Sequence, residues 1–176
     1  LKALIDRLKA RGVGTTIVDG ALSRLSLASP AVTEAMILAT GAAVAGNIPE
    51  LVRKTKYVYE LIGIEEIEEA LRTRLDPLTQ GVWAVSDGGE PIDLELPSVL
   101  MLERSGENLF RHGRRIYATG IVTDKLFQLL RTQQREVELI VRDFTRVFAS
   151  PEAFYAFLRR GHRIRVVHLS LIHISE

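Results

Sequence analysis

Two short apolar runs near the start of the chain have the pattern of buried strands. They occupy residues 15–18 and 36–39, and each is followed by a small polar pair, Asp19-Gly20 in the first case and Thr40-Gly41 in the second. Apolar runs of this length, bounded by glycine, are typical of parallel strands covered on both faces. We therefore expect two parallel strands here, with a crevice at their carboxyl ends, where open α/β sheets usually bind ligands.

Apolar residues spaced by three and four positions predict five helices. Their expected starts are Leu1, Asn47, Ile64, Thr123 and Ser150. The helix from Asn47 is the clearest, because Glu50 completes a capping-box-like pair with Asn47. It should end at Gly63, and the next helix should end at Asp76-Pro77.

Further apolar or alternating runs predict strands at 81–86, 92–96, 116–118, 137–141 and 164–168. The turn at 87–90 should join the first two of these in a hairpin. The alternation of helices and strands predicts an α/β fold: a largely parallel sheet with flanking helices, in Rossmann-like or P-loop-like layering, and a β-hairpin insertion near 82–96. We expect one such domain over residues 1–168.

Composition narrows the functional classes. The chain has 176 residues, 47% of them hydrophobic, a formal net charge of +1 and no cysteine. Interspersed charges argue against a nucleic-acid surface, and the absence of cysteine excludes disulfides, thiolate metal sites and a cysteine nucleophile. Because the sequence contains neither a long apolar span nor a signal peptide, we expect a cytoplasmic protein with no membrane partner.

The two ends of the chain have unusual features. The first residue is Leu1, within an amphipathic helix that has no cap, so we expect a truncation at the N-terminus. Residues 169–176 closely resemble the translated sequencing-adapter read-through found at the ends of proteins from metagenomic assemblies. This resemblance implies a non-native tail, and the alternative is a genuine edge strand.

Several strand ends and helix starts could hold a ligand. Glycine beside an anion lets backbone amides approach it, helix N-termini favour phosphates, and an aspartate can contact magnesium. ATP or GTP with magnesium would suit such a crevice, with Asp19 as the metal contact and Arg24 as an anion clamp. The alternative is that these residues only form turns and caps. The candidate ligand-binding residues are Asp19, Gly20, Arg24, Thr40, Gly41, Asn47, Thr119, Gly120 and Thr123, with Asp143 at a further strand end.

Motifs that would complete a catalytic site are missing from the sequence. It contains no GxxxxGK[ST] loop and no GxGxxG after a strand. No two histidines have the i, i+4 spacing of a helical metal pair, and no serine lies in a GxSxG elbow. We therefore expect no metal site other than a magnesium contact at Asp19, and we assign no catalytic residue.

Four stretches carry a resemblance to a known family: VDGALSRLSLASPAVTEAMILATGAAV, ELVRKTKYVYELI, YATGIVTDKLFQLL and VRDFTRVFASPEAFYAFL. They resemble an uncharacterised family of anaerobic, clostridial-type bacteria. Some members accompany the adenosylcobalamin-dependent lysine and ornithine aminomutases as a reactivating-factor subunit. The resemblance implies a cytoplasmic accessory protein that works with a partner ATPase on an aminomutase whose cobalamin has been inactivated.

Three hypotheses about function follow. The first is this accessory protein, which binds a partner ATPase subunit or the aminomutase and is not catalytic alone. The second is a fragment of a P-loop-like NTPase whose phosphate loop lies upstream of Leu1, with the 15–18 strand carrying the magnesium-coordinating Asp19. The third is an interaction module without a ligand.

Overall fold

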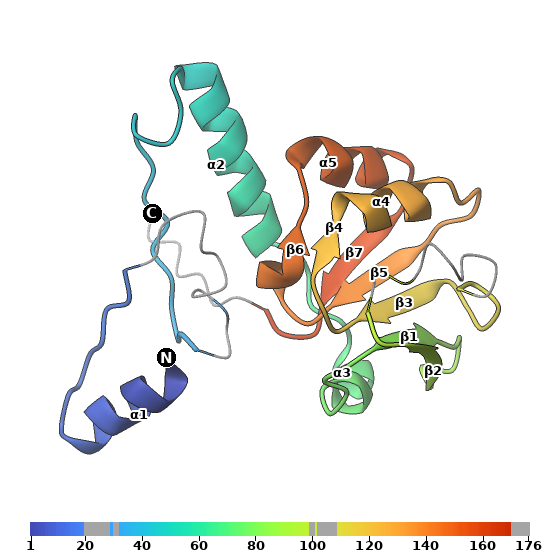
Figure 1. Ribbon diagram of the computed structural model, residues 1–176, viewed down its shortest axis with the longest axis horizontal. Helices are drawn as coiled ribbons and strands as arrows, with labels where there is room; N and C mark the ends of the chain where they lie inside the picture. Colours follow the sequence, from blue (N-terminus) through green and yellow to red (C-terminus); the bar gives the residue numbers. More distant parts are fainter. Residues whose placement is uncertain (20–28, 30–31, 99–100, 102–108, 170–176) are drawn as a thin grey trace.

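The computed structural model describes residues 1–19, 29, 32–98, 101 and 109–169. Its main part is an α/β unit built on a five-stranded sheet with strand order β2-β1-β3-β5-β7 (Figure 1). The strands are β1 (Val82–Val85), β2 (Pro91–Leu96), β3 (Arg115–Ala118), β5 (Glu138–Val141) and β7 (Arg163–Val166). The last three pair in parallel, whereas β1 is antiparallel to both β2 and β3. The sheet is therefore mixed.

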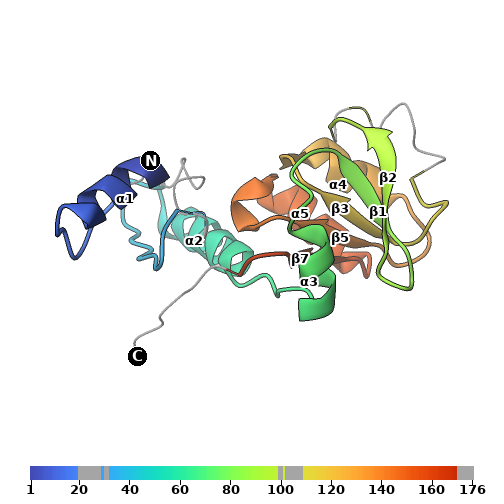
Figure 2. The same cartoon turned by 90° about the horizontal axis from the view of Figure 1, so that it is seen from below.

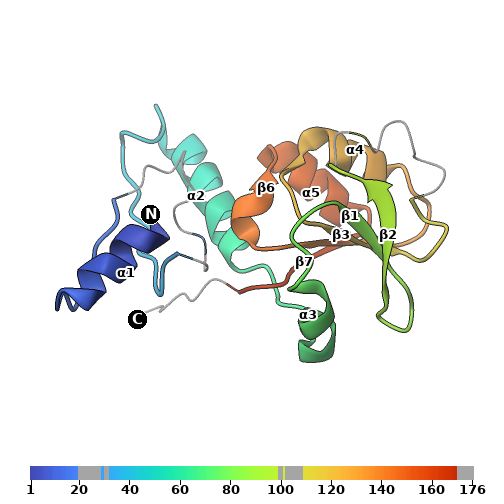
Figure 3. The same ribbon diagram turned by 60° about the horizontal axis from the view of Figure 1, so that its bottom comes forward.

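Helices cover both faces of this sheet. The helices α4 (Asp124–Arg131) and α5 (Pro151–Arg159) connect the parallel strands and lie together on one face, whereas α3 (Glu69–Leu75) lies on the other (Figure 3). Side chains alternate accordingly along β5, since Leu139 and Val141 belong to the core under α4 and α5 and Ile140 to the core under α3. Because β3, β5 and β7 are neighbours and run in parallel, their carboxyl ends lie side by side at one edge of the sheet.

Short elements follow these carboxyl ends. The strands β4 (Val122–Thr123) and β6 (Val147–Phe148) pair in parallel as a second, two-stranded sheet. One turn of 3-10 helix, η3 (Phe144–Arg146), precedes β6. The sequence pattern predicts neither of the two short strands, because two residues are too few to show a period.

The part of the chain before the α/β unit extends away from it (Figure 2). It contains α1 (Lys2–Ala10), which buries none of its residues, and α2 (Ile48–Ile62). We call the described residues before α2 the N-terminal arm. The C-terminal half of α2 packs on the α/β unit through Tyr57, Val58, Leu61 and Ile62, all of which are buried.

The α/β class and the hairpin are confirmed. β1 and β2 pair around the predicted turn, where the Ser86 amide donates to the Glu90 carbonyl at 3.0 Å. The Asn47 cap is also confirmed, since its side chain accepts from the Glu50 amide at 2.9 Å. Within the described residues, no helix is long and apolar enough to cross a membrane.

Two predictions of local structure are wrong. Residues 15–18 and 36–39 form no strand, and among the described residues no backbone hydrogen bond joins either run to another segment. An apolar run becomes a strand only when another backbone pairs with it. The helix expected from Ile64 begins at Glu69, because residues 65–67 pair with the outer edge of β7: Ile67 donates to Val166 at 2.9 Å, and Val166 donates to Glu65 at 3.0 Å.

Candidate functional site

The crevice predicted near the start of the chain is not formed by paired strands. Asp19 is exposed, and Gly20 and Arg24 lie outside the described residues. Thr40 is exposed and its hydroxyl lies 2.9 Å from that of Thr55 on α2. Thr40 and the neighbouring Gly41 therefore lie beside α2 and not at a sheet edge.

The predicted helix starts are used for structure. The Asn47 side chain is occupied by the Glu50 amide. Thr123 makes no side-chain cap within the described residues, and next to it the Asp124 carboxylate accepts from the Ser150 amide at 2.6 Å and from its hydroxyl at 2.9 Å. Because this acid already lies between the N-termini of α4 and α5, an anion at Thr123 would meet a negative charge.

Thr119 and Gly120 do lie at a carboxyl end, that of β3. Thr119 is buried, with both its amide and its hydroxyl donating to the Gly81 carbonyl, at 3.3 Å and 2.8 Å. Its polar atoms therefore hold β1 to β3. Gly120 faces open space where a side chain would begin.

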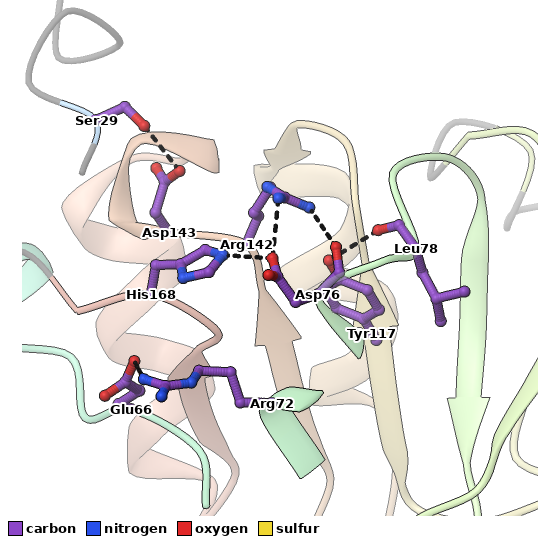
Figure 4. A network of polar contacts seen from close by, with 9 residues as sticks. All are labelled: Ser29, Glu66, Arg72, Asp76, Leu78, Tyr117, Arg142, Asp143 and His168. Carbon is purple, nitrogen blue, oxygen red and sulfur yellow. Dashed lines mark hydrogen bonds and ion pairs between the residues drawn. The ribbon is translucent and has the colours of Figure 1, made fainter. Parts of the chain in front are cut away.

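A different set of side chains meets at the carboxyl edge of the parallel strands (Figure 4). Arg142 follows β5 directly, and His168 follows β7 by two residues. The His168 amide donates to the Arg142 carbonyl at 2.9 Å, so strand pairing continues beyond β7 and places the two residues side by side. Asp76, which ends α3, and Tyr117 of β3 complete what we call the carboxyl-edge cluster: Asp76, Tyr117, Arg142 and His168.

Asp76 is the centre of this cluster. Its Oδ1 lies 3.0 Å from Arg142 Nη2 and 2.7 Å from His168 Nε2. Arg142 Nη1 also donates to the Asp76 carbonyl at 3.2 Å. The side chains of Arg142, His168 and Asp76 are 25%, 32% and 47% exposed, so solvent reaches all three and a small solute could contact them.

Tyr117 forms the inner wall of the cluster. It is buried, and its hydroxyl donates to the Leu78 carbonyl at 3.2 Å. Burial raises the pKa of the Tyr117 phenol above its ordinary value, while the Arg142 guanidinium acts in the opposite direction. Tyr117 is therefore a neutral hydroxyl at physiological pH.

Asp143, the further strand end predicted from the sequence, is only 2% exposed. Its Oδ1 accepts from the Thr145 amide at 2.9 Å and from the Thr145 hydroxyl, and its Oδ2 accepts from Ser29 Oγ at 3.1 Å. These bonds cap η3 and connect residue 29 to the α/β unit. Both carboxylate oxygens therefore have structural partners.

The cluster can bind and orient polar groups. The Asp76–His168 pair fixes one imidazole nitrogen, and Arg142 supplies a permanent positive charge. In the part of the chain that the structure describes, no group of three histidine, aspartate or glutamate side chains could hold a metal ion.

Sequence reasoning missed three of the four cluster residues as candidates and treated the fourth, Asp76, only as a helix end. The signal available was the one used for Thr119: a polar residue directly after a buried strand. Applied to residues 137–141, it points to Arg142, whereas His168 is the last residue of the predicted run 164–168. Comparison with family models, curated proteins and solved structures found no match to the chain. The function is therefore inferred from the residues and their geometry.

Proposed function

We propose that the protein is an accessory protein that docks onto a larger partner through its N-terminal arm and α2, and that it is not catalytic on its own. The observation that carries the proposal is a stripe of exposed apolar side chains along α2. Ile48, Val52 and Tyr59 are 75%, 57% and 55% exposed. Their spacing of four and seven residues puts them on one face of the helix.

This stripe lies on the face of α2 that the α/β unit leaves open. The buried residues of α2 all lie in its C-terminal half, so the first two turns project beyond the α/β unit (Figure 1). Exposed apolar side chains on one face of a projecting helix are the usual geometry of a helix that binds a groove in another protein. The stripe therefore supports docking more directly than single exposed side chains would.

The arm carries two further exposed isoleucines. Ile17 and Ile37 are 90% and 94% exposed, and both lie in extended segments that pair with no other segment among the described residues. A partner that covered them would bury two β-branched side chains, each worth roughly 1.5–3 kcal/mol of transfer free energy. This gain favours association.

The resemblance found in the sequence supplies the class of partner. It implies the ATPase subunit of an aminomutase-reactivating system, or the adenosylcobalamin-dependent lysine or ornithine aminomutase itself. ATP or GTP with magnesium would then be bound chiefly by the ATPase partner.

The experiment is a binding titration of this protein with the purified aminomutase and with its ATPase subunit, by calorimetry. Val52→Glu and Ile37→Glu should each weaken binding about tenfold or more, since burying a charge in an apolar interface costs at least ~1.4 kcal/mol. Ile121→Glu is the control, because Ile121 is 49% exposed but lies outside the arm and α2.

Equal affinities for the wild type, Val52→Glu and Ile37→Glu would refute the docking surface. Loss of binding in Ile121→Glu as well would show that any exposed acid disturbs the complex. Absence of binding to both the aminomutase and the ATPase would refute the partner class that the resemblance implies.

The alternative hypotheses have less support. The P-loop-like NTPase fragment depended on a strand at 15–18 ending in Asp19, and that strand is not formed. Rossmann-like layering is supported by the parallel strands β3, β5 and β7, with α4 and α5 on one face and α3 on the other, but the antiparallel β1 and β2 depart from it. An interaction module without a ligand would use the same docking surface. Binding of a ligand at the carboxyl-edge cluster would exclude it.

A further inference from the structure

Arg146 is a cation without a partner beside the carboxyl-edge cluster. It is the last residue of η3, the turn that follows β5, and it is only partly exposed. Its Nε is buried and has no hydrogen-bond partner. Among the described residues, no ion pair or hydrogen bond involves the Arg146 guanidinium. The exposed arginine Arg163, by contrast, pairs with Glu136 at 2.6 Å.

An unpartnered guanidinium that is partly removed from water is costly unless something else compensates its charge. The nearest acids do not do so. Asp143 is only three residues away, but its two oxygens accept from Thr145 and Ser29. Asp76 is shared between Arg142 and His168.

Arg146 belongs to the same surroundings as the cluster. It follows Arg142 by four residues, in the turn η3 that comes directly after the carboxyl end of β5. In agreement with this placement, both Arg142 and Arg146 lower the pKa of the Tyr117 phenol against the effect of burial. Two guanidiniums and an imidazole thus lie at this edge of the sheet, and among the described residues Asp76 is the carboxylate that bonds to Arg142 and to His168. The arrangement has one more cationic donor than its acceptors satisfy.

We propose that this edge of the sheet is an oxyanion site that binds the phosphate group of a small ligand, with Arg142, Arg146 and His168 as donors and Asp76 as the internal carboxylate that the phosphate displaces. Arginine forks match phosphate geometry. Carboxyl ends of parallel strands are also where α/β proteins usually bind phosphorylated ligands. Free inorganic phosphate and the phosphates of a nucleotide share this chemistry.

The inference does not depend on the proposed docking function, because the docking surface lies on α2 and the arm. The experiment titrates the full chain with inorganic phosphate and, separately, with ATP in the absence of magnesium. Binding is followed by calorimetry and by the NMR signal of the His168 ring. Inorganic phosphate should give saturable binding in the wild type and shift the His168 signal. ATP binding more tightly than phosphate identifies a nucleotide, whereas equal affinity identifies the phosphate group alone.

Three variants test the site. Arg146→Gln should weaken phosphate binding about tenfold without loss of folding, because its side chain has no partner to lose. Asp76→Asn should strengthen binding several-fold, since it removes the competing carboxylate, a gain that a purely structural role would not produce. Arg163→Gln is the matched control, because Arg163 lies at the opposite end of β7 and should leave affinity unchanged.

Absence of saturable phosphate and ATP binding in both the wild type and Asp76→Asn would overturn the proposal. An equal loss in Arg146→Gln and Arg163→Gln would also overturn it, because binding would then follow net charge and not this site. The docking titrations use neither phosphate nor these variants, so the two proposals can fail separately.

Discussion

Tyr57 is the residue on which the position of α2 depends. Its ring is buried and packs edge-on against Phe154 of α5, with 5.5 Å between ring centroids. Its hydroxyl donates to the Ala149 carbonyl at 2.6 Å, and burial raises the pKa of the phenol above its ordinary value. Removing first the hydroxyl and then the ring should therefore loosen α2 in two measurable steps.

The magnitudes follow from these contacts. Tyr57→Phe removes one hydrogen bond to a part-buried carbonyl and should cost about 1 kcal/mol, a roughly fivefold increase in the population in which α2 is detached. Tyr57→Ala also removes the aromatic contact and leaves a cavity, for a total of about 3–5 kcal/mol. That cost raises the detached population by more than a hundredfold.

Hydrogen exchange measured by mass spectrometry gives a direct assay. Peptides covering α2 should lose protection in the order wild type, Tyr57→Phe, Tyr57→Ala, while peptides from β5 stay protected. Tyr59→Phe is the control on the same helix, because Tyr59 is 55% exposed and no hydrogen bond of its hydroxyl is found among the described residues. Equal effects of Tyr57→Phe and Tyr59→Phe, or full protection of α2 in Tyr57→Ala, would refute this account.

Two further predictions concern the core of the α/β unit. Phe157→Ala should lower the free energy of unfolding by about 3–5 kcal/mol and the melting temperature by roughly 10 °C, because Phe157 is fully buried. Phe148→Ala should change the free energy of unfolding by less than about 1 kcal/mol, because Phe148 is 51% exposed. Similar melting temperatures for the two variants would contradict this prediction. Burial lowers the pKa of His162, whose Nδ1 accepts from the Val137 amide at 3.2 Å, so the unfolded chain takes up this proton first and stability should fall as the pH drops below about 6.5. Denaturation of the wild type and His162→Gln between pH 5 and 8 checks this, and identical pH dependence in both would exclude His162 as the cause.

Local signals explain which parts of the fold could be predicted. The Asn47 cap, the end of α2 at Gly63 and the turn at 87–90 depend on residues within a few positions of one another. Each is found where the sequence places it. The strand runs of the α/β unit were also predicted to within two or three residues, since each has a neighbour to pair with.

Long-range contacts explain what could not be predicted. Residues 15–18 and 36–39 have the composition of strands, but composition does not supply the second backbone that a strand needs. The contact between Asp76 and His168 spans 92 positions, and an Asp-Pro pair after a helix carries no sign of such a partner. The cluster therefore lies at the carboxyl edge of β3, β5 and β7, whereas the crevice was predicted beside the runs 15–18 and 36–39 and with different residues.

The pairing of residues 65–67 with β7 has a consequence for how the protein can associate. It occupies the outward-facing backbone groups of Val166 at one border of the sheet, which would otherwise accept a strand from another molecule. At the other border, β2 begins with a proline, and its pairing with β1 is interrupted by a register shift next to Trp83. Both borders thus resist edge-to-edge aggregation, so growth of the sheet across molecules is disfavoured and association is directed to the helical and extended segments before it.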